Sequence, residues 1–161
     1  MHGRPQSLGR RIWRYGPALL WIAVISIAST DAFSSDHTGE IIIPAVHWMF
    51  PGLSPDALEN VHTGIRKAAH VTEFAIFALL VARAFLSSSR YWLWRHWFVL
   101  TLLVVFAMGL ADEYHQSFVS SRTASIIDSL IDASGGLLAI SLLAVCRHRN
   151  RPPPIHWPED F

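Results

Sequence analysis

The chain has 161 residues, of which 52% are hydrophobic and only 16% charged, with a formal net charge of +1 at pH 7. Ordinary soluble domains are more polar than this, so the composition favours a membrane protein of one domain. The basic residues stand in short separate groups without interleaved stacking aromatics, which argues against a nucleic-acid partner, and a single cysteine, Cys146, excludes an intramolecular disulfide.

Four apolar runs are long enough to cross a bilayer as helices, at residues 17–33, 68–86, 92–111 and 126–145. A hydrocarbon core about 30 Å thick needs roughly 20 apolar residues at helical rise. The sequence therefore predicts an all-α integral membrane bundle of four transmembrane helices. This membrane domain, residues 15–146, lies between a basic N-terminus (1–14) and a proline-rich tail (147–161).

The first apolar run has a second interpretation. Three arginines precede it and three small residues stand at positions 28–30, as in a secretory signal peptide. The run is long for the apolar region of a signal peptide, however, and Trp13 with Tyr15 forms an interfacial anchor at its basic end. We therefore interpret it as a transmembrane helix.

The segment after the first run is expected to stay outside the hydrocarbon core. Residues 41–53 are apolar but too short to span a bilayer, and two prolines interrupt them, so they are expected to lie at the interface. Ser54 as a cap and Pro55 at the first helical position predict a short external amphipathic helix that ends near His62. Gly64 is expected to break or bend the chain before the second span.

The distribution of basic residues predicts the orientation in the membrane. Of the 13 Lys and Arg residues, all but Arg66, Lys67 and Arg122 fall on the side that carries both termini. Because cytoplasmic loops carry the excess of Lys and Arg, both termini are expected in the cytoplasm, with the protein in the cytoplasmic (inner) membrane. Most of the acidic residues gather on or near the outer side.

Ionisable residues interrupt the second and fourth spans near that outer side. His70 and Glu73 lie one turn apart, as do Asp128 and Asp132, so each pair shares a helix face. A charge at mid-membrane costs roughly 2.5–3.5 kcal/mol, so these groups are expected to face the bundle interior. With an external loop at residues 112–118, they predict one polar site, consisting of Arg66, Lys67, His70, Glu73, Asp112, Glu113, His115, Gln116, Arg122, Asp128 and Asp132.

The sequence resembles the VanZ-like family, named for a factor associated with teicoplanin resistance. The resemblance is carried by residues 65–74, by residues 112–118 through Arg122, and by Asp128 with Gly135 and Gly136. It covers about residues 26–143 and implies a multi-span bundle at the cell envelope, a link to glycopeptide resistance for the named member, and no established reaction.

Two positions depart from the family pattern. Ser120 and Ser121 replace the usual Pro-Gly pair before the loop arginine, and Asp132 replaces an asparagine. The second departure makes the predicted site more acidic than the family pattern.

The first functional hypothesis is a binding site for an anionic or sugar-bearing envelope ligand, such as a lipid-linked precursor, a phospholipid head group or a glycopeptide antibiotic. Arg66, Lys67 and Arg122 would hold phosphate, while the carboxylates and Gln116 would accept hydrogen bonds from hydroxyl groups of the ligand. Apolar helix walls beside the site suit a lipid tail. Membrane lipids are the expected partners.

Two further hypotheses remain open. His70, Glu73, Asp112 and His115 could hold a divalent metal for a membrane-embedded hydrolase or transferase, although their spacing matches no known metal motif and no cofactor is expected. Alternatively, the cluster is purely architectural and holds the outer halves of the helices in register. Proton-coupled transport ranks last, since four spans leave little room for alternating access.

Overall fold

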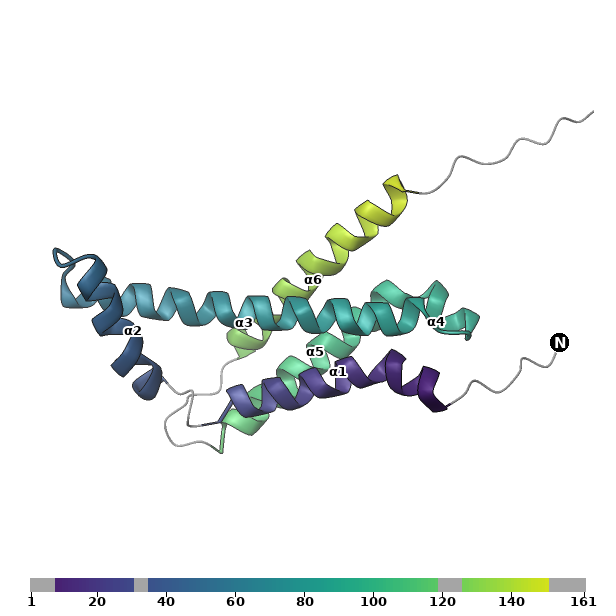
Figure 1. The fold of residues 1–161 in the computed structure, drawn as a ribbon, viewed down its shortest axis with the longest axis horizontal. Coiled ribbons are helices and arrows are strands. Elements are labelled where there is room, and N and C mark those ends of the chain that lie inside the picture. The colour runs from purple at the N-terminus through teal and green to yellow at the C-terminus, as the bar shows by residue number, and fades with distance from the viewer. Residues whose placement is uncertain (1–7, 31–34, 119–125, 151–161) are drawn as a thin grey trace, which may run out of the picture.

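The structure is a computed structural model that describes residues 8–30, 35–118 and 126–150 (Figure 1). The described residues form helices and no strands, which confirms the all-α prediction. The helices are α1 (Leu8–Ala28), α2 (Ser35–Met49), α3 (Pro55–Leu86), α4 (Tyr91–Arg95), α5 (Trp97–Gln116) and α6 (Ile126–Arg149).

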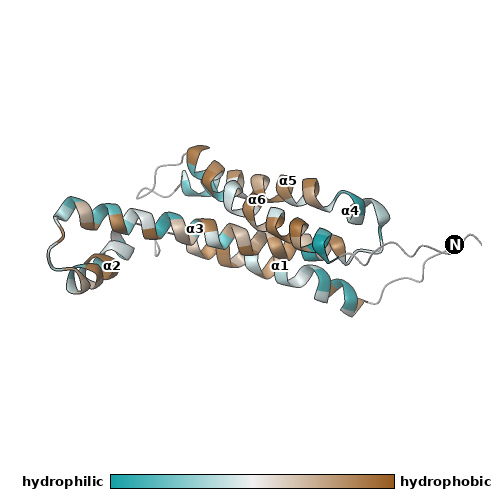
Figure 2. Cartoon of the chain, turned by 90° about the horizontal axis from the view of Figure 1, so that it is seen from above, coloured by the Kyte–Doolittle hydropathy of each residue, from teal (hydrophilic) through white to brown (hydrophobic). Residues whose placement is uncertain are grey.

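The long helix α3 is the centre of the bundle. It contacts α1, α2, α5 and α6, and α5 also packs against α6. In Figure 1, α2 lies at one end of the molecule, whereas the start of α1, α4 and the end of α6 lie toward the other. Hydrophobic residues dominate the middle of the bundle, and hydrophilic residues gather at the first turns of α1 (Figure 2).

Small residues let α6 approach its neighbours closely. A Cβ atom added at Gly135 would lie 3.0 Å from the Cα of Val71 on α3, and one at Gly136 would lie 2.7 Å from a methyl carbon of Val105 on α5. Both separations are shorter than ordinary van der Waals contact, so the two glycines permit a packing that any side chain would prevent. The core beside them contains fully buried Phe74.

Within the described part of the chain, three helices are long and apolar enough to cross a membrane: α3, α5 and α6. They correspond to the second, third and fourth predicted spans. Helix α1 is not among them, because Arg10, Arg11 and Arg14 occupy its first half and leave only residues 15–28 without a charge. A fourth crossing by α1 therefore stays a prediction. Helix α1 nevertheless packs along α3, with Ala18 and Ile25 in the core.

The predicted break at Gly64 is wrong. Ser54 does cap the helix, since its Oγ accepts a hydrogen bond from the backbone N of Ala57 at 3.3 Å, but α3 then runs without interruption to Leu86. An isolated glycine inside a helix costs only about 1 kcal/mol, which tertiary packing readily offsets. The separate helix before α3 is instead α2, which includes most of the segment expected at the interface.

Two other boundaries also differ from the prediction. Helix α4 ends at Arg95, so the third long helix begins at Trp97 and not at Trp92. Residues 112–116 belong to the last turns of α5 and are not a loop, because polar side chains that face the interior need not leave the helix. The first residues of the predicted tail, up to Arg149, continue α6, and residues 151–161 lie outside the described part.

Candidate functional site

The last turns of α5 turn their polar side chains toward the bundle. Asp112, Glu113 and Gln116 are buried, whereas Tyr114 and His115 are exposed. Positions i, i+1 and i+4 fall on one side of a helix, so the buried set is the face that meets the other helices. Most residues of α5 are apolar, and its polar last turns also lie in the interior of the bundle.

The carboxylate of Asp112 is held from two directions. Ser29, just past the end of α1, donates a hydrogen bond from Oγ to Oδ1 of Asp112. Gln116 donates from Nε2 to Oδ2 at 2.7 Å. Both donors are buried, with exposed fractions of 2% for Ser29 and 6% for Gln116. The end of α1 is therefore tied to α5, and the carboxylate points in a defined direction.

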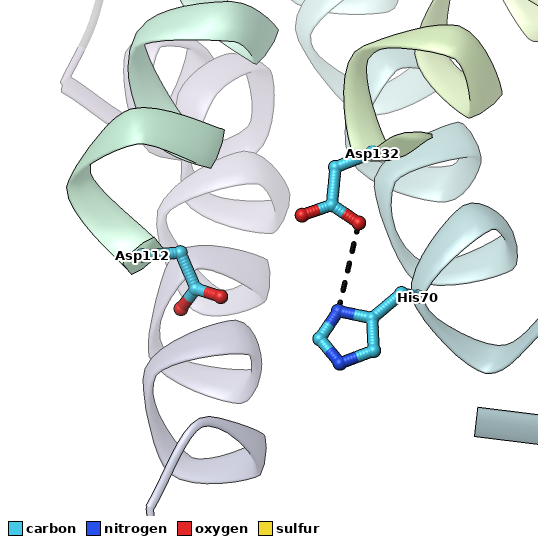
Figure 3. A group of neighbouring side chains, drawn as sticks. All are labelled: His70, Asp112 and Asp132. Atoms are coloured by element: carbon cyan, nitrogen blue, oxygen red, sulfur yellow. Dashed lines mark ion pairs between the residues drawn. The ribbon is translucent and has the colours of Figure 1, made fainter. Parts of the chain in front are cut away.

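A second carboxylate comes from α6. Asp132 is 1% exposed, and its Oδ1 lies 3.5 Å from Nδ1 of His70 on α3 (Figure 3). Its other oxygen, Oδ2, is buried and has no hydrogen-bond partner. Burying a polar atom without a partner is unfavourable by roughly 1–3 kcal/mol, and more for a charged group. The lack of a partner for this buried oxygen therefore has to be explained by the properties of the site.

His70, Asp112 and Asp132 together form a group that we call the triad. Each offers one nitrogen or oxygen atom, and these three atoms all lie within 4.8 Å of one another. Figure 3 shows the three side chains extending from three helices toward a common space. Two ligands of one ion with bonds of about 2.0–2.6 Å lie roughly 3–5 Å apart, depending on the angle between the bonds, so the spacing of the triad is compatible with a metal site.

Glycine packing explains how α5 and α6 come close enough to form the triad. A Cβ atom on Gly109 would lie 3.5 Å from the backbone oxygen of Ser129 and 3.8 Å from the Cβ of Asp132. Ser129 also donates from Oγ to the backbone oxygen of Gly109 at 3.3 Å. On the other side of α6, Gly135 contacts the backbone of α3 at Val71, next to His70.

The remaining predicted residues surround the triad less closely. Arg66, Glu73 and Asp128 are half-buried, Lys67 and His115 are exposed, and Arg122 lies outside the described residues. The backbone oxygen of Glu73 accepts a hydrogen bond from Nε1 of Trp21 at 3.0 Å, and this bond joins α3 to α1. Of the metal ligands expected from the sequence, the triad includes His70 and Asp112, whereas Asp132 takes the place of Glu73 and His115.

Ser29 is a site residue that the sequence interpretation missed. In the sequence it stands only as one of three small residues at the end of an apolar run. The available signal was its position: the hydroxyl stands at the C-terminal end of the first helix, and the acids of the other helices were expected from the sequence at the same side of the bundle.

Fold and site together define a multi-span membrane protein with a buried acidic site between its helices. A comparison with protein families matches residues 15–147 to the VanZ/LLP1 family, so the chain belongs to that family of membrane proteins. No curated protein and no solved structure matches the chain. The matched residues include all three members of the triad.

Proposed function

We propose that the chain is a multi-pass protein of the cytoplasmic membrane that binds a divalent metal ion at the triad and, through it, the anionic head group of a cell-envelope ligand. The supporting observation is the buried Oδ2 of Asp132, which lacks a hydrogen-bond partner beside two further potential ligands. A cation would supply the missing partner.

The charges of the triad favour this proposal. Two carboxylates and one imidazole lie within a few ångströms, with Asp112 and Asp132 almost completely buried. Buried carboxylates that share a site repel each other unless a proton or a cation lies between them. A divalent ion offsets both charges, whereas His70 alone can offset only one.

The number of protein ligands in the triad also supports the binding of a further group to the metal. Three protein ligands leave at least one coordination position for another group, as in sites where a metal binds water or a substrate. Carboxylate and imidazole ligands suit Zn²⁺ or Mn²⁺, and both ions bind phosphate oxygens. Lys67 is exposed one turn before His70, so it is well placed to pair with a phosphate held by the metal. The ligand class is therefore a phosphate-bearing lipid or lipid-linked precursor.

The position of the triad supports a site in the outer leaflet. The triad lies at the end of α5 and the start of α6, away from the arginine-rich end of the bundle formed by the start of α1, α4 and the end of α6. The positive-inside rule assigns that arginine-rich end to the cytoplasm. A ligand of the triad would then come from the outer leaflet or from the envelope beyond it.

A hydrolase or transferase is the second candidate function. The same open position would allow a metal-bound water to attack a phosphoester or an amide. The two functions differ in one measurable outcome, because an enzyme converts its lipid substrate whereas a binding protein returns it unchanged. For this chain the link to glycopeptides comes from the family resemblance, and teicoplanin is therefore one ligand to test.

The first experiment is native mass spectrometry with metal analysis on gently solubilised protein, loaded with ZnCl₂ or MnCl₂ alone. We expect about one ion per chain in the wild type and at least about tenfold weaker binding in Asp132→Asn. Asp128→Asn is the matched control, since it removes the same charge from the same helix one turn away and should bind the metal normally. Equal metal content in all three proteins, or no metal in the wild type, would leave the architectural role as the explanation.

A further inference from the structure

The arginine-rich end of the bundle contains a cavity that is separate from the triad. Its volume is about 330 Å³, and it lies between the start of α1 and the connection from α3 to α4. Its walls are polar for the most part. The lining residues are Arg11, Arg14, Tyr15, Ser88, Ser89, Arg90 and Leu93.

Three arginines line this cavity, and no acidic side chain does so among the described residues. The Nε atom of Arg14 is buried and has no hydrogen-bond partner. Its guanidinium carbon lies 6.0 Å from the centre of the Tyr15 ring, a contact that orients the group but satisfies no donor. The cavity therefore combines concentrated positive charge with an unused donor.

A neighbouring arginine shows the contrast. Arg83 donates from Nη1 to the backbone oxygen of Trp13 at 3.2 Å, and its guanidinium lies 5.5 Å from the centre of the Trp13 ring. Arg83 thus serves to attach α3 to α1. Arg14 is half-buried and makes no comparable hydrogen bond through Nε, so a structural role of this kind does not account for the burial of that atom.

The surroundings of Arg14 distinguish a lipid from a free ion. Arg14 also lines a second cavity of about 420 Å³, whose wall area is mainly apolar; its other lining residues are Gly9, Arg10, Trp13, Arg83 and Ser87. An anionic head group in the first cavity would thus have an apolar path beside it for an acyl chain. Free phosphate has no acyl chain, so it would bind in the polar cavity without placing an apolar group in the second one.

We propose that the arginine-lined cavity binds the phosphate group of an anionic phospholipid from the leaflet at this end of the bundle. Guanidinium groups match phosphate oxygens through paired, charge-assisted hydrogen bonds. The hydroxyl groups of Ser88 and Ser89 add neutral partners. Anionic lipids are concentrated in the cytoplasmic leaflet, the side that the positive-inside rule assigns to this end.

The test uses the full-length protein in nanodiscs of phosphatidylcholine with phosphatidylglycerol, released for native mass spectrometry. We expect one phosphatidylglycerol to stay bound after the other lipids dissociate, and about tenfold less of this complex in Arg14→Gln, since a hydrogen bond to a charged group has that order of effect. Arg149→Gln is the control. It removes the same charge from an exposed position at the same end and should keep the lipid.

Other results would overturn the proposal. Equal loss in Arg14→Gln and Arg149→Gln would mean that only the overall charge attracts lipid. Retention by Arg14→Gln would show that the cavity is not the site. Displacement of the bound lipid by millimolar inorganic phosphate would identify a free anion as the ligand. Arg14→Lys keeps the charge but loses the forked guanidinium group, so it should retain an intermediate amount of bound phosphatidylglycerol. Circular dichroism should show unchanged helix content in every variant.

Discussion

At the scale of single residues, glycines decide how closely the helices of this bundle pack. Gly135 lies one turn after Asp132 and contacts the backbone of α3 at Val71, the neighbour of His70. The glycine therefore sets the distance between two members of the triad. At Gly64, in contrast, an added Cβ atom would have no neighbour within 4 Å, so the missing side chain serves no contact.

These two glycines give opposite predictions for the same substitution. Gly135→Ala should lower the free energy of unfolding by about 1–3 kcal/mol, because the new methyl group forces α6 away from α3. Gly64→Ala should raise it by up to about 1 kcal/mol, because alanine favours the helix and meets open space. Thermal unfolding of both variants in the same detergent measures the difference. A loss of stability in Gly64→Ala, or none in Gly135→Ala, would contradict the packing described.

Much of the triad was predictable from the sequence, and the reason is physical. His70, Asp112 and Asp132 stand within or beside apolar runs, where an ionisable group must face the interior. The pairing among them was not predictable, because it depends on helix rotation and on the close approach at Gly109 and Gly135. Helical periodicity gives the face of one helix but not the partner that this face meets.

At the scale of helices, the attachment of α2 to α3 depends on a buried histidine. His62 is 1% exposed, and its Nε2 lies 3.1 Å from Oγ1 of Thr38 on α2. A Cβ atom on Gly39 would lie only 3.4 Å from the ring, so α2 packs directly on it. The sequence predicted only that a short helix ends near His62, because a lone histidine at the end of a polar segment gives no sign of its partner.

His62→Ala should therefore loosen α2 without unfolding the rest of the bundle. The substitution removes the hydrogen bond and leaves a cavity between two helices, and it should lower the local opening free energy by roughly 2 kcal/mol or more. Hydrogen exchange of residues 38–49 should become faster, while exchange in α5 and α6 stays the same. Glu59→Gln is the control, because Glu59 is exposed and its contact with His62 is long, at 3.7 Å. Equal acceleration in both variants would exclude the proposed role of the ring.

Helix boundaries were harder to predict than helix existence. Over its described residues, each long apolar run is mainly helical, although the run at residues 92–111 is divided between α4 and α5. Helices suit such runs because they satisfy every backbone polar group inside a bilayer. The positions of the helix ends depended on features that the hydrophobic pattern of the sequence does not contain. Helix α3 passes through Gly64, and α5 extends to Gln116 because its polar side chains find partners inside the bundle.

At the scale of the whole molecule, the unsettled element is α1. Its charged first half keeps it outside the set of candidate spans. Its contacts nevertheless match those of a crossing helix: Trp21 donates to the backbone of α3, and Ser29, beyond its last turn, donates to Asp112 in the last turns of α5. Its first turns meet the end of α3, where Arg83 donates to the backbone oxygen of Trp13. Helix α1 therefore extends from one end of α3 to the level of the triad.

This arrangement predicts a fourth crossing, with the start of α1 in the cytoplasm and the end of α5 outside. Single cysteines at Leu8 and Ser117, both exposed, in a Cys146→Ser background test it in intact cells. A membrane-impermeant maleimide should label Ser117→Cys from outside and should label Leu8→Cys only after the membrane is permeabilised. Labelling of both from outside would place α1 on the outer surface. In that case Arg11 and Arg14 would face the outer leaflet, and the lipid proposed for their cavity would have to come from there.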